Sequence, residues 1–526
     1  MLFNSIEFMF AFLPLTLLVF YQIGRRGYQK WAIAWLVAAS LFFYSWWNPS
    51  YLALLIFSIL FNYYLGSALS GKFQLPVSQK WQLAFGIIVN LALIGYFKYA
   101  NFFVSTVNDL VGTNFNLHRI ILPLAISFFT FQQIAYLVDA YRGETKEYNF
   151  LNYCLFVSFF PQLIAGPIVH HKDILPQFAQ KSLYRFNYEN LTVGLTIFSL
   201  GLFKKVALAD TVAVYATPVF NAAATGGQIA FLEAWGGVLA YTMQLYFDFS
   251  GYSDMAIGAA RMFGIKLPVN FNSPYKSVNI IDFWRRWHIT LSHFLRDYLY
   301  IPLGGSRKGK VRRFFNLMIT MLLGGLWHGA GWTFVFWGGL HGVYLIINHQ
   351  WHSFRRSLGH DLNKIHWWGR ILGCWLTFMA VVVAWIFFRA ENMEAAFNIL
   401  RGISGANGIV FPERLADMLG IKFILSHLGV TFKIGGVTRL LSTYIDLIFL
   451  LTIAWLFPNT QEWMAQYQPV LKTEQKLDNS QGTYNFWRKL QWQPTLPFAL
   501  IVGSLIFFSL KTFLSAKVSE FLYFNF

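Results

Sequence analysis

The sequence predicts an all-α protein that crosses a membrane many times. Hydrophobic residues make up 56% of the 526 residues and charged residues only 12%, whereas soluble domains carry roughly 25% charged residues. Aromatic residues reach 19%, including 20 tryptophans, which suits the belts that Trp and Tyr form at membrane surfaces. No polar stretch is long enough for a separate soluble domain, so we expect residues 1–526 to form one membrane-embedded domain.

Apolar windows of the length expected for membrane helices recur along the chain. They lie near residues 6–23, 31–46, 51–69, 82–97, 119–138, 151–169, 191–206, 230–248, 314–327, 332–348, 371–388, 440–457 and 495–513. We expect about 11–13 membrane segments, with re-entrant and interfacial helices included. The loops after the first and third windows are basic, whereas the loops around 47–50 and 106–117, after the second and fourth, carry no Lys or Arg. The positive-inside rule therefore places the N-terminus outside the cytoplasm and the loop at Arg25 inside it.

One window, 151–169, breaks this alternation because basic residues flank it on both sides. Its segment 161–167 also contains two prolines and a glycine, which interrupt a helix. Non-helical backbone is tolerated inside a membrane only where protein or a water-filled cavity covers it. We therefore predict a re-entrant element here, and surface loops or interfacial helices in the polar stretches 389–430 and 458–493.

Composition also excludes several classes of function. The net charge of +18 does not indicate a nucleic-acid partner, because the basic residues lie in short loops where the positive-inside rule accounts for them. The two cysteines, Cys154 and Cys374, lie among apolar residues and argue against a disulfide scaffold. His349 and His352 are three apart, but no Cys or carboxylate lies near them in sequence. We therefore expect no metal site.

The stretch 314–354 contains no Asp, Glu, Lys or Arg, yet it contains four histidines and is bracketed by basic residues. Roughly 40 residues of helix measure ~60 Å, enough to cross a ~30 Å hydrocarbon core and return. Both ends of such a hairpin would lie in the cytoplasm. Helical rise then places His328 and His341 near a depth of ~20 Å. Titratable residues inside a membrane are candidates for function.

Two interpretations of these histidines stay open. His328 is either a core histidine bonded to a backbone carbonyl or a general base, because a buried imidazole stays neutral near pH 7. Nearby glycines would let the helix open and let a ligand approach the backbone. These are Gly324, Gly325, Gly329 and Gly331. His341 either orients a partner or packs in the core.

The window 277–300 carries both helical apolar periodicity and five charges, which exclude an ordinary lipid-facing span. We predict an amphipathic helix that lies in the interface or lines a cytoplasmic funnel. Trp284, Trp287 and His288 share its apolar face. Arg285 and Arg286 suit an anionic ligand or lipid phosphates.

A third polar feature is the segment 247–258, which gathers five polar residues at the end of an apolar window. They are Asp248, Ser250, Tyr252, Ser253 and Asp254. A serine nucleophile is weakly supported, since the second glycine of a G-x-S-x-G elbow is missing and no strand precedes it. The other interpretation is a helix terminus with its capping groups.

Several motifs resemble the membrane-bound O-acyltransferase family. DFWRRWHITLS covers residues 282–292, RDYLY covers 296–300 and WHG covers 327–329. The likeness is to the bacterial branch of alginate O-acetyltransferase membrane subunits and teichoic-acid D-alanyl transfer proteins. Segments 161–167, 247–258 and 270–275 also resemble the alginate type. The likeness covers most of residues 1–350, with the motif-bearing core at about 119–350, and neither main motif departs from the family's pattern.

This resemblance implies a ring of helices around a thinned centre, with a funnel from each face. It implies that His328 is the catalytic histidine and that His288 is a second tunnel residue. The residues expected to bind substrate are Arg285, Arg286, Trp284, Trp287, Trp327 and His341. The expected reaction moves an acetyl group from a cytoplasmic thioester such as acetyl-CoA toward an extracytoplasmic polysaccharide, with no bound cofactor.

The resemblance further implies an extracytoplasmic partner of the serine-hydrolase-like acetyltransferase class and a multi-pass location in a bacterial inner membrane, among membrane lipids. Two alternatives come from other classes. A transporter with a midplane site would fit the glycine-interrupted windows, but it predicts internal repeats that the sequence lacks. A non-catalytic scaffold for polysaccharide export is the other alternative.

Overall fold

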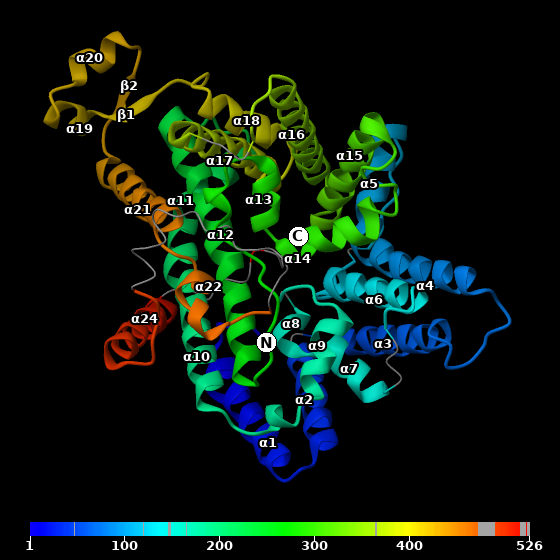
Figure 1. Cartoon of the computed structure of the whole chain (residues 1–526). Helices are drawn as coiled ribbons and strands as arrows, with labels where there is room; N and C mark the ends of the chain where they lie inside the picture. The colour runs from blue at the N-terminus through cyan, green and yellow to red at the C-terminus, as the bar shows by residue number, and fades with distance from the viewer. Residues whose placement is uncertain are drawn as a thin grey trace. The chain divides into compact units, whose positions relative to one another are not determined.

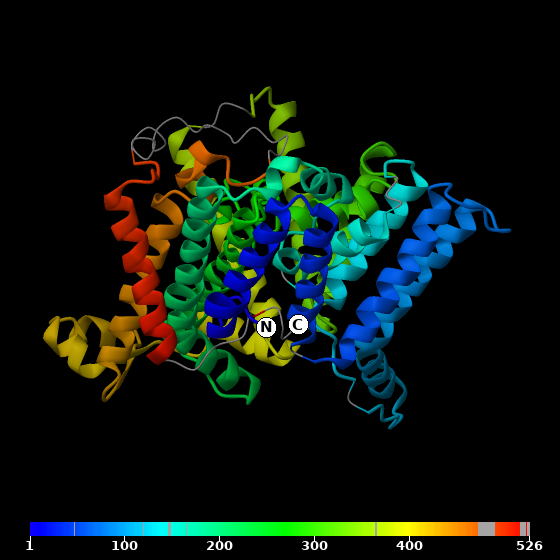
Figure 2. The same cartoon turned by 90° about the horizontal axis from the view of Figure 1, so that it is seen from below.

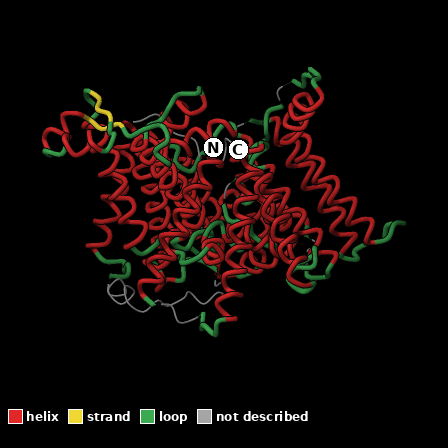
Figure 3. Tube along the Cα trace, turned by 90° about the horizontal axis from the view of Figure 1, so that it is seen from above, coloured by secondary structure: helices red, strands yellow, loops and turns green. Residues whose placement is uncertain are grey.

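The computed structural model describes residues 1–46, 48–118, 120–145, 149–164, 166–362, 366–471, 490–515 and 522. Half of the polar stretch predicted at 458–493, residues 472–489, therefore lies outside the described residues. Among those described, the strands are β1 (Val410–Pro412) and β2 (Thr431–Lys433), which form one short parallel pair. Everything else with regular structure is helical (Figures 1 and 3). The prediction of an all-α protein is confirmed.

Seven helices in the described part of the chain are long and apolar enough to cross a membrane. They are Glu7–Arg25, Ser50–Leu69, Gln79–Val111, Tyr188–Ala224, Trp367–Arg389, Val437–Leu456 and Leu496–Ser515. Each coincides with one of the predicted apolar windows, and two of them run well beyond their window because the helix continues through polar residues. The protein is a multi-pass membrane protein, as predicted.

The chain divides into two compact units, and two long helices contribute to both. The first unit comprises Met1–Phe203, Gly251–Asn270 and the described residues that follow Thr460. Its elements are η1 (Glu7–Phe12), α1 (Leu13–Arg25), α2 (Gln29–Ser45), α3 (Ser50–Leu69), α4 (Gln79–Ile94), η2 (Gly95–Tyr99), α5 (Ala100–Val111), α6 (Ile126–Tyr141), α7 (Phe150–Ser158), α8 (Phe160–Leu163), α9 (His171–Phe178), η3 (Lys181–Tyr184), α10 (Tyr188–Phe203), the end of α12 (Phe231–Met262), α22 (Thr460–Trp463), η7 (Ala465–Tyr467) and α24 (Leu496–Ser515).

The second unit comprises Lys204–Ser250 and Phe271–Asn459. Its elements are η4 (Lys204–Ala209), α11 (Asp210–Ala224), the first part of α12, η5 (Pro274–Lys276), α13 (Ile280–Arg286), α14 (Ile289–Leu295), η6 (Arg296–Tyr300), α15 (Gly309–His328), α16 (Trp332–Ser357), α17 (Trp367–Arg389), α18 (Met393–Ile403), β1, α19 (Glu413–Met418), α20 (Lys422–His427), β2 and α21 (Val437–Leu456). The expectation of a single domain over 1–526 stays a prediction.

Glycines hold α10 and the end of α12 together in the first unit. A Cβ added at Gly194 would lie 2.7 Å from the carbonyl oxygen of Gly258, and one added at Gly201 would lie 2.5 Å from that of Gly251. Only glycine permits such an approach of two backbones, which is the way membrane helices gain van der Waals contact. On its other side α10 packs against α24, as Figure 2 shows.

Buried amides link four helices of the same unit. Asn62 of α3 and Asn90 of α4 donate to each other's side-chain oxygens, at 3.3 and 2.7 Å. Gln133 of α6 donates to Ser58 at 3.4 Å and accepts a hydrogen bond from Tyr153 of α7. Polar side chains in hydrocarbon favour partners on neighbouring helices, so this network fixes their order.

The predicted break in the window 151–169 is confirmed. Helices α7 and α8 are separated at Phe159, and the chain after α8 is irregular and buried. Gln132 and Gln162 both donate to the carbonyl of Phe156, at 2.9 and 2.5 Å, so two side chains satisfy the interrupted backbone. Whether this segment is re-entrant stays a prediction.

The segment 247–258 corrects one prediction. It is not a helix terminus, because α12 runs through it without interruption and buries it. The serines therefore lie inside a helix, where a nucleophile elbow cannot form. Asp254 accepts hydrogen bonds from Thr460 at 2.6 Å and from Gln461 at 3.2 Å, so residues distant in sequence satisfy it.

The predicted hairpin over 314–354 is present as α15 and α16, which pack against each other along their length (Figure 1). Neither helix is among the seven that meet the requirements for a span, so the crossing itself stays a prediction. A Cβ at Gly338 would lie 2.3 Å from the carbonyl oxygen of Met321, and one at Gly329 would lie 2.2 Å from the Phe334 ring. These two glycines allow close packing of the hairpin, and whether the glycines at 324–331 also admit a ligand stays a prediction.

Candidate active site

Helical structure is interrupted at His288, where one amphipathic helix was predicted over 277–300. The structure instead has α13 and α14, with His288 between them at a φ of +43°. A residue with a Cβ seldom adopts this left-handed conformation, and such residues gather at functional sites. Helical periodicity alone predicts one continuous helix here. The prediction of a single helix was wrong, because two helices meet at His288. The His288 side chain is fully buried, as its apolar position suggested.

His288 and His328 lie close together, although they come from two separate motifs. Their ring centroids are 6.3 Å apart. His328 is the last residue of α15 and is 4% exposed. Three aromatic rings surround it, with centroids at 4.9 Å for Trp327, 5.1 Å for Trp337 and 5.2 Å for Phe388. Phe249 packs edge-on against His288 at 4.8 Å. The two imidazoles therefore lie together in a buried cluster of aromatic rings, which we call the aromatic cluster.

His341 of α16 extends this aromatic cluster. It is fully buried, and its Nδ1 accepts a hydrogen bond from the indole nitrogen of Trp284 at 3.3 Å. Its ring lies 4.8 Å from that of Trp337, which also contacts His328. Since Nδ1 is the acceptor, a neutral His341 carries its proton on Nε2.

Trp287 and Phe271 form one side of the aromatic cluster. Trp287 is 1% exposed and packs between Phe271 at 5.1 Å and Trp385 at 4.9 Å. Phe271 also faces His288, with ring centroids 6.5 Å apart. Residues from three sequence motifs, 282–292, 327–329 and 270–275, thus contribute to the aromatic cluster.

The two arginines differ in their surroundings. Arg286 donates through Nε to the Asp282 carboxylate at 2.8 Å and through a terminal nitrogen to the carbonyl of Asn272 at 3.4 Å. Arg285 is exposed. The geometry gives Arg286 a structural task and leaves Arg285 as the better candidate for an anionic ligand.

Comparison with known proteins decides the family. The sequence profile of the membrane-bound O-acyltransferase family (MBOAT) matches residues 41–387. The chain belongs to this family. It is therefore an O-acyltransferase, and the transporter and scaffold alternatives are not favoured.

The curated relatives include acetyl-transferring members. The chain is 45% identical to a peptidoglycan O-acetyltransferase of Helicobacter pylori, over 82% of this chain and 87% of that protein. It is 38% identical to a protein of Pseudomonas putida named probable alginate O-acetylase AlgI, over the full length of both. A teichoic acid D-alanyltransferase of Streptococcus thermophilus is 29% identical over 50% of this chain and 68% of that one.

Metal ligands do not gather at the site of this acyltransferase. In the described part of the chain, no group of three or more His, Cys, Asp or Glu side chains could hold a metal ion. His349 and His352 lie near the C-terminal end of α16, whereas His341 lies nearer its middle.

Sequence reasoning missed one buried charge of this MBOAT protein. Lys205 lies inside the long apolar helix Tyr188–Ala224 and is 1% exposed. Its Nζ lies 2.6 Å from Asp248 and 2.8 Å from Asp210. The predicted window 191–206 includes Lys205 near its end, and no role was predicted for this residue. The missed signal is the helix that continues beyond it to Ala224, because a charge inside a candidate membrane span is a candidate for function.

Proposed function

We propose that this acyltransferase moves an acetyl group from a cytoplasmic acyl thioester, such as acetyl-CoA, toward an extracytoplasmic polysaccharide. The acceptor would be an alginate-like exopolysaccharide or a cell-wall glycan, since relatives are named for O-acetylation of alginate and of peptidoglycan. The protein would work in a bacterial inner membrane as one membrane-embedded domain. It would deliver the acetyl group to an extracytoplasmic acetyltransferase of the serine-hydrolase-like class.

The observation that carries this proposal is the pairing of His288 and His328 at 6.3 Å within the aromatic cluster. Water exclusion strengthens electrostatic interactions there. A neutral imidazole can then accept the proton of a hydroxyl that attacks the thioester carbonyl. The new C–O bond forms as the C–S bond breaks, and the thiol leaves with the proton returned by the imidazole.

The remaining residues support this reaction in distinct ways. His341 would present its Nε2–H to the developing oxyanion, because Trp284 occupies Nδ1. Trp287 and Trp327 would shape the acyl pocket. Arg285 would bind the phosphates of the donor, with Arg286 holding the segment in place.

The test is substitution of His328 by Ala and, to preserve volume, by Gln. Both variants should lose at least ~10²-fold in acetyl transfer, the usual contribution of a general base. Acetyl groups on the cell's glycans, measured by mass spectrometry with and without the gene, would identify the acceptor as well. His352→Ala on the same hairpin is the matched control and should retain activity. Near-normal acetylation by inserted His328→Gln protein would reject the assignment.

A second experiment separates the two possible roles of His328. As a general base it never carries the acyl group, whereas as a nucleophile it forms an acyl-imidazole. Protein mixed with radiolabelled donor in the absence of acceptor and quenched rapidly would be labelled stoichiometrically only in the second case. His328→Gln protein supplies the background.

A further inference from the structure

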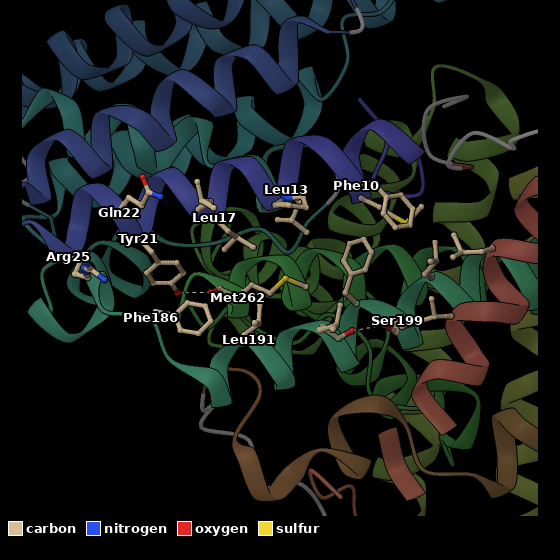
Figure 4. A pocket seen from close by; sticks show the side chains of 18 of the residues that line it. Phe10, Leu13, Leu17, Tyr21, Gln22, Arg25, Phe186, Leu191, Ser199 and Met262 are labelled. Atoms are coloured by element: carbon tan, nitrogen blue, oxygen red, sulfur yellow. Dashed lines mark hydrogen bonds between the residues drawn. The ribbon is translucent and has the colours of Figure 1, made fainter. Parts of the chain in front are cut away.

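A groove of about 850 Å³ lies in the first unit, on the surface of α1, α10 and α24. Its lining includes none of the three histidines of the candidate active site. Most of its lining side chains are apolar, as Figure 4 shows for Leu13, Leu17 and Leu191. The groove therefore calls for a different, largely apolar ligand.

One end of the groove is polar and positively charged. Arg25, Arg26 and Gln22 line it there, and all three side chains are exposed. Figure 4 shows Arg25 and Gln22 at one end, with Phe10 and Ser199 toward the other. The arginines belong to the loop that charge asymmetry places in the cytoplasm. The charged end thus lies at a membrane surface and the apolar part extends into the hydrocarbon.

The floor of the groove is fixed by a hydrogen bond. The hydroxyl of Tyr21 donates to the carbonyl of Met262 at 2.7 Å, and both residues line the groove. This bond joins α1 to the end of α12. It therefore fixes the groove near its charged end, since Tyr21 lies one helical turn before Arg25.

The dimensions of the groove match one leaflet of a bilayer. From Phe10 to Arg25, helical rise gives ~22 Å, against ~15 Å for half of the hydrocarbon core. That length accommodates an acyl chain together with the glycerol and phosphate above it. Guanidinium groups bind phosphate through paired hydrogen bonds.

We propose that this groove binds one anionic phospholipid of the cytoplasmic leaflet, with its phosphate on Arg25 and Arg26 and an acyl chain along the apolar floor. The proposal goes beyond the acyl transfer reaction and uses none of its residues. The simpler explanation is that both arginines only mark the cytoplasmic end of α1. A second arginine pair, Arg355 and Arg356, lies in the last turn of α16 and does not line the groove. It is therefore a matched control.

The experiment measures lipid retention by native mass spectrometry. Purified, delipidated full-length protein is exposed to mixed micelles with phosphatidylglycerol or phosphatidylcholine. The unmodified protein should retain phosphatidylglycerol preferentially. Arg25→Gln with Arg26→Gln should lower that preference by roughly tenfold to thirtyfold, from the known effect of basic residues at anionic membranes. Arg355→Gln with Arg356→Gln should leave it unchanged.

A second pair of variants tests the apolar part. Leu18 lines the groove and is 54% exposed, whereas Leu15 on the same helix is 57% exposed and lies outside it. Leu18→Trp should fill the groove and reduce retention of both lipids several-fold, and Leu15→Trp should not. Equal retention of the two lipids by the unmodified protein would overturn the proposal, as would an unchanged preference in the Arg25 and Arg26 variant.

Discussion

The indole N–H of Trp284 donates to Nδ1 of His341 at 3.3 Å, and this bond joins α13 to α16. Both rings also contact Trp337, at centroid distances of 5.9 and 4.8 Å. The pair is therefore held by one directional bond and by shared packing. The bond selects the tautomer with its proton on Nε2, which is the donor that His341 would offer to a reacting group.

Trp284→Phe should separate these two contributions. The phenyl ring retains most of the packing against Trp337 but cannot donate, so kcat should fall by about fivefold, the equivalent of a hydrogen bond worth ~1 kcal/mol. The melting temperature should change little. Acetyl transfer at saturating donor, with Trp351→Phe on the exposed side of α16 as the control, measures this effect. Equal turnover in the two variants would show that the bond does not orient His341.

The left-handed conformation of His288 makes a second prediction. His288→Asn should fold, because Asn tolerates a positive φ, and it should lose activity with the imidazole ring. His288→Val should also be destabilised by about 1–3 kcal/mol, since a β-branched residue is strained at this φ. Thermal unfolding in detergent, paired with a transfer assay, distinguishes the two. Equal stability of both variants would mean that the turn relaxes without strain.

The apolar windows predicted the helices well because hydrocarbon favours continuous apolar sequence and backbone groups bonded within each helix. The hairpin of α15 and α16 followed from the same rule. The prediction failed where distant partners decide the structure. The polar segment around Asp254 suggested a helix end. In the structure, the hydroxyl of Thr460 donates a hydrogen bond to the buried carboxylate of Asp254 and so compensates for its burial. A single sequence does not reveal a partner that lies so far along the chain.

Dependence on tertiary contacts also limited how much of the candidate site the sequence could predict. The sequence singled out His288 and His328 one at a time, but not their proximity, which depends on a turn at His288. Helical periodicity is a sum over many residues and is insensitive to one left-handed residue. The sequence also could not distinguish the surroundings of Arg285 and Arg286, because the hydrogen bond from Arg286 to Asn272 is a tertiary contact.

Those surroundings predict different kinetics for the two arginines. Arg285→Lys should raise the donor KM with a smaller effect on kcat, because Lys cannot form paired hydrogen bonds to phosphate. Arg286→Lys should weaken the contacts to Asp282 and Asn272 and lower stability by about 0.5–1.5 kcal/mol. Initial rates over a range of acetyl-CoA concentrations and thermal unfolding give the comparison. An unchanged KM for the inserted Arg285→Lys protein would leave lipid anchoring as its task.

His171 predicts acid sensitivity in the first unit. Burial lowers the pKa of His171 from 6.5 to about 4, against an opposing effect of Asp139. The unfolded chain takes up a proton near pH 6.5 that the folded protein refuses, so stability falls as the pH falls from 6.5 to 4. The loss should reach ~3 kcal/mol.

The test variant should keep a polar partner for Thr145, whose hydroxyl lies 2.7 Å from Nδ1 of His171. His171→Asn should flatten the decline in melting temperature between pH 6.5 and 4. His360→Asn, at an exposed position, should not. A decline of the same steepness in all three proteins would assign the acid sensitivity to other groups.

The ion cluster of Lys205 predicts the largest effect on stability. Lys205 and Asp248 are each 1% exposed and 2.6 Å apart, and Asp210 is 20% exposed. Removing one member of a buried pair leaves an uncompensated charge, which costs about 3–5 kcal/mol. Lys205→Met should therefore unfold at a markedly lower temperature, whereas Lys204→Met next to it should change stability by less than about 1 kcal/mol.

A double substitution separates the pairing from the shape of the site. Lys205→Met with Asp248→Leu replaces both charges by apolar groups, and such replacements of buried pairs are often neutral or stabilising. The double variant should recover most of the loss, because Asp210 is partly exposed and can be hydrated. Thermal unfolding of the two single variants and the double variant completes the cycle. If the double variant were no more stable than Lys205→Met alone, the lysine would stabilise the helix through its packing and not through its charge.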